Sequence, residues 1–363
     1  MKKTNPVQHW RIEFDDKQAL SAYHAICHEH ISQGPLVYEF EKKLASYLNV
    51  PYVVATTSGS IALLMSMMAI GIKHGDEVIV PNRTWIATAH APYILGANIK
   101  LVDVEKDRPI IDARLIEEKI TGKTKAIIPV HLGGRAADMN VINEIAKRYN
   151  IKVIEDAAQA LGSRNAQGLL GTQSDLGCFS LSVAKIISTG QGGFIATRNE
   201  DLYAKLIAIR THGVGDIINA KWDQPGFNFR YTDILAAIGI QQLQNIGEKI
   251  KIVQNIYQEY ERGLASTRNI KIIPINLANG ELPVYVEVLS KNRESLIKYL
   301  KENGINCRPF YPSLHKAQYF NNANNFTNSD VFGDEGVYLP SGPGQDIDNI
   351  KLVIQCINNF DVL

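Results

Sequence analysis

Residues 179–193 read Phe-Ser-Leu-Ser-Val-Ala-Lys-Ile-Ile-Ser-Thr-Gly-Gln-Gly-Gly, so that one lysine, Lys185, stands among apolar residues just before a glycine turn. The flanking segments, 176–181 and 193–197, are β-prone and predict two buried strands joined by a short loop. Burial disfavours a charged ammonium, and a neutral amine is a nucleophile that can form a Schiff base with a carbonyl compound. The alternative is a lysine whose stem packs on the core while its head reaches water. The rest of the chain decides between the two.

The length and charge of the chain limit its class. At 363 residues, it suits one large and one smaller domain, and its 45% hydrophobic residues are enough for a sizeable core. Lys and Arg number 38 against 37 Asp and Glu, a formal charge of +1. This balance indicates neither a nucleic acid nor an anionic membrane as partner, so we expect a small-molecule substrate.

The cysteines are far apart in sequence and show no metal-ligand spacing. We expect reduced thiols in a cytoplasmic protein, because the chain begins Met-Lys-Lys-Thr-Asn-Pro without an apolar signal region. No apolar run approaches the ~18 residues that span a bilayer. The histidines at 24, 28 and 30 lack a carboxylate at a suitable spacing, so no metal is predicted. The four cysteines are Cys27, Cys178, Cys307 and Cys356.

Apolar strands alternate with helices through the first two thirds of the chain, which predicts a largely parallel sheet covered on both faces. The predicted strands are 52–55, 77–81, 100–104, 125–130, 152–156, 176–181 and 193–197. The predicted helices include 37–48, 61–70, 84–95, 112–120, 139–149 and 201–210.

A second domain is indicated after residue 245. A long polar helix, 246–264, links the two parts, and from residue 270 the pattern changes to short strands mixed with helices. The predicted division is a large domain, 1–245, and a small α+β domain, 246–363, on which roughly the first 30 residues could pack.

The stretch Thr56-Thr-Ser-Gly-Ser60 lies between a predicted strand and a long apolar helix. Free N–H groups and the positive dipole end of a helix start favour a phosphate, and Gly59 lets a ligand approach the backbone closely. The simpler interpretation is a helix N-cap without a ligand.

Asp156 ends one of the predicted parallel strands, at the edge of the sheet where ligands bind. It is followed by Ala-Ala-Gln-Ala, with no cation nearby in sequence. The alternative role for this carboxylate is to cap a helix.

A phosphate-binding turn, a flat aromatic, a strand-end carboxylate and a buried lysine are the parts needed to hold pyridoxal 5′-phosphate (PLP). Lys185 would form the internal aldimine, and Asp156 would keep the pyridine nitrogen protonated so that the ring acts as an electron sink. Trp85 could stack on the ring, and Gln159 could bind the phenolic oxygen. The phosphate is expected to contact the side chain of Ser180 and the backbone of Gly59 and Ser60.

From residue 34 to the last helix, the chain resembles the nucleotide-sugar aminotransferases of the DegT/DnrJ/EryC1/StrS family. The resemblance implies an aspartate aminotransferase-like, fold type I PLP enzyme with a mostly parallel seven-stranded sheet. It also implies that Lys185 is the aldimine lysine and proton shuttle, that Asp156 pairs with the ring nitrogen, and that Ser58 helps to bind the cofactor. Asn228 would reach the phosphate of the other subunit, so a homodimer with shared active sites is expected. The residues that carry the resemblance are 57–63, 81–85, 129–131, 155–160, 179–193 and 226–230.

The run 304–315 is similar to the perosamine-synthase branch of the family. This similarity implies amination, by L-glutamate, of C4 of a nucleotide-linked 4-keto-6-deoxyhexose for surface-polysaccharide (O-antigen) synthesis, with ping-pong kinetics. Ser182, Arg230 and His315 are the expected substrate contacts. The nucleotide remains open among GDP, dTDP and UDP.

Two positions depart from the family pattern. Members often have histidine or tyrosine where this chain has Ser182, and many have an acidic residue where it has Gln191. Amination at C3 and a non-catalytic homologue that binds PLP or a sugar nucleotide therefore stay as alternatives. A keto-sugar 3-dehydratase is disfavoured, since those relatives carry histidine at the place of Lys185.

Overall fold

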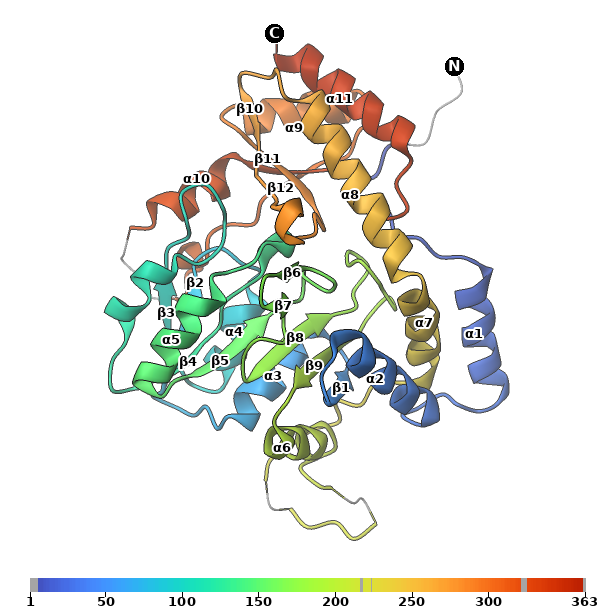
Figure 1. Ribbon diagram of the computed structural model, residues 1–363, viewed down its shortest axis with the longest axis vertical. Coiled ribbons are helices and arrows are strands. Elements are labelled where there is room, and N and C mark those ends of the chain that lie inside the picture. The colour runs from blue at the N-terminus through green and yellow to red at the C-terminus, as the bar shows by residue number, and fades with distance from the viewer. Residues whose placement is uncertain (1–5, 216–217, 223, 321–324, 362–363) are drawn as a thin grey trace.

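The computed structural model describes residues 6–215, 218–222, 224–320 and 325–361 (Figure 1). Within these residues, seven strands form the central sheet, and β9 runs antiparallel to both of its neighbours while the others lie parallel. This confirms the predicted α/β class. The order of strands across the sheet is β1 (Tyr52–Thr56), β9 (Gly193–Thr197), β8 (Leu176–Ser180), β5 (Lys152–Asp156), β4 (Thr124–Ile127), β2 (Glu77–Pro81) and β3 (Asn98–Val102).

Helices cover both faces of this sheet because successive strand residues point to opposite sides. On β2, Val78 and Val80 join the core beneath one helical layer, whereas Ile79 joins the core on the other side. The first layer contains α3 (Gly59–Ala69), α4 (Ala87–Ile94) and α6 (Glu200–Arg210). The second contains α2 (Pro35–Leu48), α5 (Met139–Tyr149) and α7 (Asp233–Gln244), with α1 (Asp16–Cys27) packed on α7.

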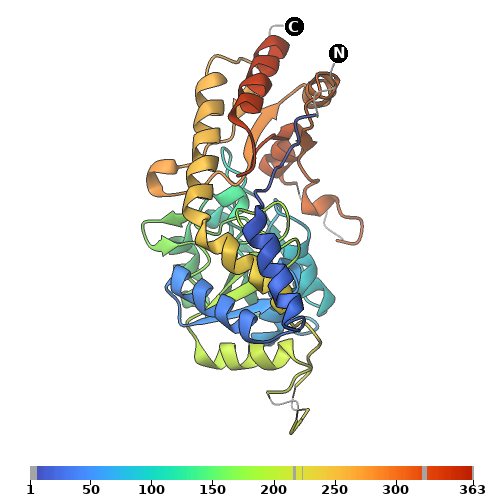
Figure 2. The ribbon, with the colours of Figure 1, turned by 90° about the vertical axis from the view of Figure 1, so that its right-hand side faces the viewer.

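A smaller α+β unit lies beyond the long helix α8 (Ile246–Gly263), as Figures 1 and 2 show. The antiparallel order of its strands, as far as the chain is described, is β10 (Ile270–Ile272), β11 (Val286–Ser290), β13 (Gly336–Leu339) and β12 (Arg308–Pro309). Its helices are α9 (Arg293–Glu302), α10 (Thr327–Glu335) and α11 (Ile347–Asp361).

The N-terminal segment is tied to this smaller unit. Val7 pairs with Ile305, and Trp10 pairs with Ser341. The side chain of Val7 is buried in the same core as α8, α9 and α11. The chain then passes to α1 on the large unit, so its first residues connect the two parts.

The helix predicted at 112–120 is wrong. Two short 3₁₀ turns occupy this segment, η1 (Ala113–Leu115) and η2 (Glu117–Lys119). The Asp112 carboxylate accepts hydrogen bonds from the backbone and side chain of Arg114, which holds a tight turn in place of a first α-helical turn. The structure also contains elements that were not predicted: α10, β13 and the small hairpin of β6 (Arg164–Asn165) with β7 (Gly168–Leu169).

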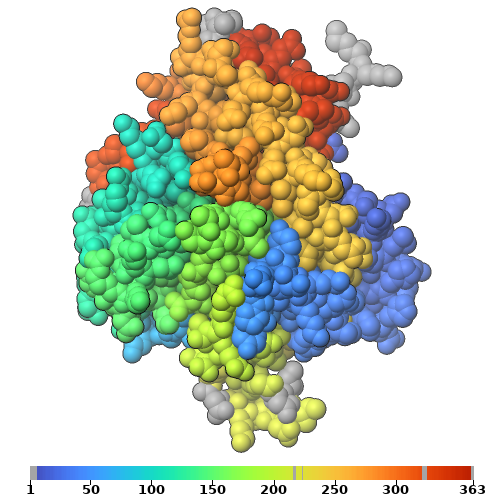
Figure 3. Space-filling model, in the orientation of Figure 1, coloured from blue at the N-terminus to red at the C-terminus, as the bar shows by residue number. Residues whose placement is uncertain are grey.

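Described residues of the connection between α6 and α7 project from the body of the protein (Figure 3). Its Trp222 is 79% exposed and its Phe227 is 61% exposed. Among the residues that the structure describes, no helix has both the length and the apolar character needed to cross a membrane.

Candidate active site

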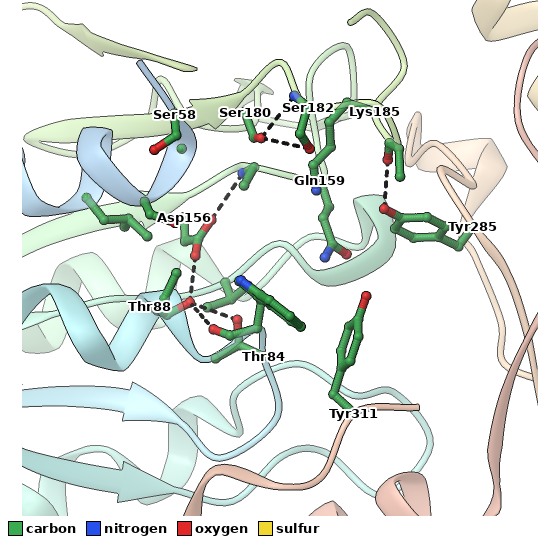
Figure 4. A pocket seen from close by; sticks show the side chains of 18 of the residues that line it. Ser58, Thr84, Thr88, Asp156, Gln159, Ser180, Ser182, Lys185, Tyr285 and Tyr311 are labelled. Carbon is green, nitrogen blue, oxygen red and sulfur yellow. Dashed lines mark hydrogen bonds between the residues drawn. The ribbon is translucent and has the colours of Figure 1, made fainter. Parts of the chain in front are cut away.

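A cavity of about 300 Å³ opens at the carboxyl ends of the parallel strands (Figure 4). Strands β1, β5 and β8 end at its wall, and the turn that follows β2 closes another side. Nine of the residues proposed from the sequence line it: Ser58, Gly59, Ser60, Trp85, Asp156, Gln159, Ser180, Ser182 and Lys185.

Lys185 lies in the loop between β8 and β9, and its side chain lines the cavity. The turn that follows needs glycine, because Gly190 and Gly192 have φ angles of 82° and 141°. Burial lowers the pKa of the Lys185 ammonium to about 8, although the nearby carboxylate of Asp156 acts in the opposite direction. A substantial fraction of this amine is therefore neutral near physiological pH.

Asp156 ends β5 with its carboxylate buried. Its Oδ2 accepts a hydrogen bond of 2.7 Å from Thr88 Oγ1, and its Oδ1 accepts one of 3.1 Å from the backbone N–H of Ala158. Burial raises the pKa of Asp156, and these two hydrogen bonds offset part of that effect. No cation among the described residues lies within ion-pair distance of this carboxylate, which suits it to receive a protonated ligand nitrogen.

The start of α3 forms one wall of the cavity. Ser58 caps the helix, with its side chain accepting from Ile61 N–H at 3.1 Å. A Cβ on Gly59 would lie 2.9 Å from Ser180 Cβ, so glycine keeps this approach open. The N–H groups of the first helical turn and the Ser180 hydroxyl together make an anion-binding surface.

Two flat side chains, those of Gln159 and Trp85, line the same cavity as Lys185. The Gln159 carbonyl oxygen accepts from Gly133 N–H at 2.8 Å, which leaves its amide N–H₂ to donate into the cavity. The Trp85 ring is 51% exposed and meets the edge of Tyr311 at a centroid distance of 4.7 Å.

These features fit PLP. The α3 start offers an anion site, and Lys185 offers an amine with a lowered pKa. Asp156 offers a buried carboxylate that makes no ion pair with any described residue. All three face one cavity, and Trp85 supplies an aromatic face beside them.

Three predicted residues do not line this cavity. Asn228 is exposed on the projecting connection, and Arg230 follows it with its backbone paired to Thr56. His315 lies in the 3₁₀ turn η5 (Leu314–Lys316), where its Nδ1 is 2.8 Å from Nδ2 of Asn82 in the large unit. Their contribution to a site stays a prediction.

Sequence reasoning missed four hydroxyl-bearing residues of the cavity. Thr84 and Thr88 are hydrogen-bonded to each other at 2.8 Å, and their four-residue spacing across the start of α4 was the available signal. Tyr285 and Tyr311 come from the small unit, and nothing local in sequence marks them.

The sequence and the fold are both similar to those of known aminotransferases. Residues 13–358 match the model of the DegT/DnrJ/EryC1/StrS aminotransferase family. The GDP-perosamine synthase of Caulobacter vibrioides is 36% identical over 335 residues, which cover 90% of each chain. The protein of the same name from Escherichia coli O157:H7 is 33% identical over 332 residues, 91% of each chain. The crystal structure of S. venezuelae DesV superposes with a TM-score of 0.94 at 27% identity and covers 99% of each chain.

Proposed function

Because this chain belongs to the DegT/DnrJ/EryC1/StrS aminotransferase family, we propose that it transfers the amino group of L-glutamate to C4 of a nucleotide-linked 4-keto-6-deoxyhexose. The enzyme is a PLP-dependent aminotransferase. The observation that carries the proposal is the meeting of Lys185, Asp156 and the α3 start in one cavity. Two relatives above 30% identity are named GDP-perosamine synthase, which supports GDP as the nucleotide.

PLP, when bound, supplies an aldehyde that can carry an amino group and a ring that can delocalise negative charge. Asp156 would accept a hydrogen bond from the ring nitrogen and so would keep the proton on that atom. The backbone N–H groups of Gly59 and Ser60, with the hydroxyls of Ser58 and Ser180, hold the phosphate.

The remaining residues orient the reacting groups. Gln159 donates from its amide to the ring oxygen, and Trp85 covers one ring face. When its amine is not bonded to the cofactor, Lys185 would take the proton from the carbon of glutamate that bears the amino group. It would then deliver that proton to the carbon that was the cofactor's aldehyde, which its lowered pKa permits near neutral pH. Tyr285 and Tyr311 narrow the cavity from the small unit and restrict the entry of water.

We expect the active unit to be a homodimer in which Asn228 of the partner subunit completes each phosphate site. Asn228 is exposed, and the same connection exposes Phe227 and Trp222, apolar side chains typical of association surfaces. A two-fold axis would let one connection from each subunit complete both sites.

The expected place of action is the cytoplasm, as the four free thiols suggest. The expected product is an amino sugar for surface polysaccharide.

The test is to incubate the PLP-loaded protein with L-glutamate and GDP-, dTDP- or UDP-linked 4-keto-6-deoxyhexose. We expect 2-oxoglutarate to form together with a 4-amino sugar, identified by mass and by NMR of the aminated carbon. Amination at C3, or no turnover although glutamate converts the cofactor, would contradict the proposed substrate. Failure of any amino acid to convert bound cofactor would favour a non-catalytic homologue.

A further inference from the structure

The two peptide groups before Lys185 are held by side chains from outside the loop. Trp10 Nε1 donates a hydrogen bond of 3.0 Å to the carbonyl oxygen of Val183. Tyr285 Oη donates one of 2.7 Å to the carbonyl oxygen of Ala184, shown as a dashed line in Figure 4. These consecutive carbonyls set the orientation of the backbone from which the Lys185 side chain departs.

Both donors are anchored on the small unit. Tyr285 immediately precedes β11, and its ring packs edge-on against Tyr338 at a centroid distance of 5.3 Å. Trp10 belongs to the N-terminal segment paired with Ser341. The two donor rings also contact each other, with centroids 5.1 Å apart.

Gly342 of the small unit leaves space for the Trp10 ring. Gly342 has a φ of 105°, and a Cβ at this position would lie 2.9 Å from the Trp10 ring and 2.4 Å from the Arg11 carbonyl oxygen. Any larger residue would displace the segment that carries Trp10. Gly342, Trp10 and Tyr285 therefore pack together as one group, and two of them, Trp10 and Tyr285, contact the loop that carries Lys185.

We propose that Trp10 and Tyr285 are positioning residues for Lys185, which fix the two preceding peptide groups and so hold the amine at one point of the cavity wall. The inference rests on the role proposed above for Lys185. Small displacements of a catalytic group lower the rate strongly, so the support should act on turnover more than on substrate binding.

The test uses the variants Tyr285→Phe and Trp10→Phe, each of which keeps a ring and removes one donor. Tyr338→Phe is the matched control, because it deletes a neighbouring hydroxyl that has no hydrogen bond to any described residue. We expect kcat to fall about tenfold in each test variant, which corresponds to ~1.4 kcal/mol, while KM for the amino donor changes less than about twofold. The control should match the wild type.

A second measurement needs no substrate. Cofactor-free protein is treated with trinitrobenzenesulfonate over a range of pH, and modification of Lys185 is followed by peptide mass spectrometry. In the wild type, the midpoint should lie near the pKa of about 8. In both test variants it should rise, because a loosened loop lets the ammonium reach water and move away from its buried position.

An unchanged Lys185 profile, even with reduced kcat, would overturn the proposal and leave only a structural role for the two side chains. A raised KM with normal kcat would overturn it as well, by making Tyr285 a substrate contact. Wild-type protein that aminates no tested sugar would count against the proposed substrate alone, since the labelling experiment is independent of it.

Discussion

Thr88 Oγ1 donates a 2.7 Å hydrogen bond to Asp156 Oδ2 inside the protein, where the carboxylate has no cationic partner among the described residues. This bond opposes the rise in the pKa of Asp156 that burial causes. Thr88→Val keeps the shape and removes the donor, so the carboxyl should hold its proton more tightly and bind a protonated ring nitrogen less well. We expect kcat to fall about 10- to 100-fold, as for loss of a hydrogen bond to a charged group. Thr88→Ser should restore most of the activity, and equal activity in the valine and serine variants would contradict this role.

Asp156→Asn should separate stability from activity. A neutral amide does not keep a ring nitrogen protonated, so turnover should fall by at least about 10²-fold. The same change removes a buried carboxylate that burial disfavours in its charged form. The Tm of the cofactor-free variant at pH 7 should therefore equal or exceed that of the wild type. Near-normal turnover would mean that Asp156 has no direct role at the cofactor.

The rate at which cofactor-free protein captures PLP should rise with pH through about 8, the lowered pKa of Lys185. At pH 7 an amine with this pKa is roughly 300-fold more often neutral than a lysine with its ordinary pKa of 10.5. Borohydride treatment should then fix the cofactor on Lys185, and Lys185→Ala should lose both capture and transamination. Recovery of another labelled lysine would refute the assignment.

The lowered pKa of Lys185 also affects stability. Between about pH 8 and 10.5, the unfolded chain binds more protons at this residue than the folded one does. The contribution of Lys185 to the free energy of unfolding should therefore increase with pH across this window. Lys185→Met should flatten that part of the curve when it is measured by urea denaturation of cofactor-free protein.

Shared active sites predict complementation. In a heterodimer of Lys185→Ala and Asn228→Asp chains, one site has both defects and the other has neither. An equal mixture that exchanges fully should reach about a quarter of wild-type activity, because half of the dimers have one intact site. No recovery, while tagged chains demonstrably form heterodimers, would show that each subunit uses its own Asn228.

Arg135 of the large unit pairs with Glu287 on β11, and both side chains are 0% exposed. The arginine also donates to the carbonyl oxygens of Ile273 and Pro274. Arg135→Met should lower the free energy of unfolding by ~3–5 kcal/mol, because Glu287 is left buried without a partner. Adding Glu287→Leu should recover much of the loss, which denaturant titration would measure. Additive losses in the double variant would exclude the ion pair as the cause.

Local patterns predicted most of the large unit. Its buried strands are short apolar runs, and the predicted spans 77–81, 152–156 and 193–197 match the observed bounds of β2, β5 and β9. The error at 112–120 has a local cause too, since the contact of Asp112 with Arg114 favours a turn over a helix. Strand order and antiparallel β9 depend on contacts between distant segments, which periodicity does not report.

The candidate site was predictable only where its residues stand at strand ends or in glycine-rich turns. Lys185, Asp156 and Gly59 carry such signals and line one cavity. Tyr285 and Trp10 bind carbonyls 101 and 173 residues away, so no sequence spacing could connect them to the lysine loop. The roles assigned to all of these residues stay predictions.

The pairing of the N-terminal segment with the small unit has a consequence for biosynthesis. Val7 is synthesised long before its partner Ile305, and Trp10 long before Ser341, so neither can pair until the small unit has been made. Nascent chains that already contain the complete large unit would still lack the strands onto which this segment docks. The contacts of Trp10 and Tyr285 with the loop before Lys185 can therefore form only after the small unit has been synthesised. A truncated translation product should remain catalytically inactive even when its central sheet is formed.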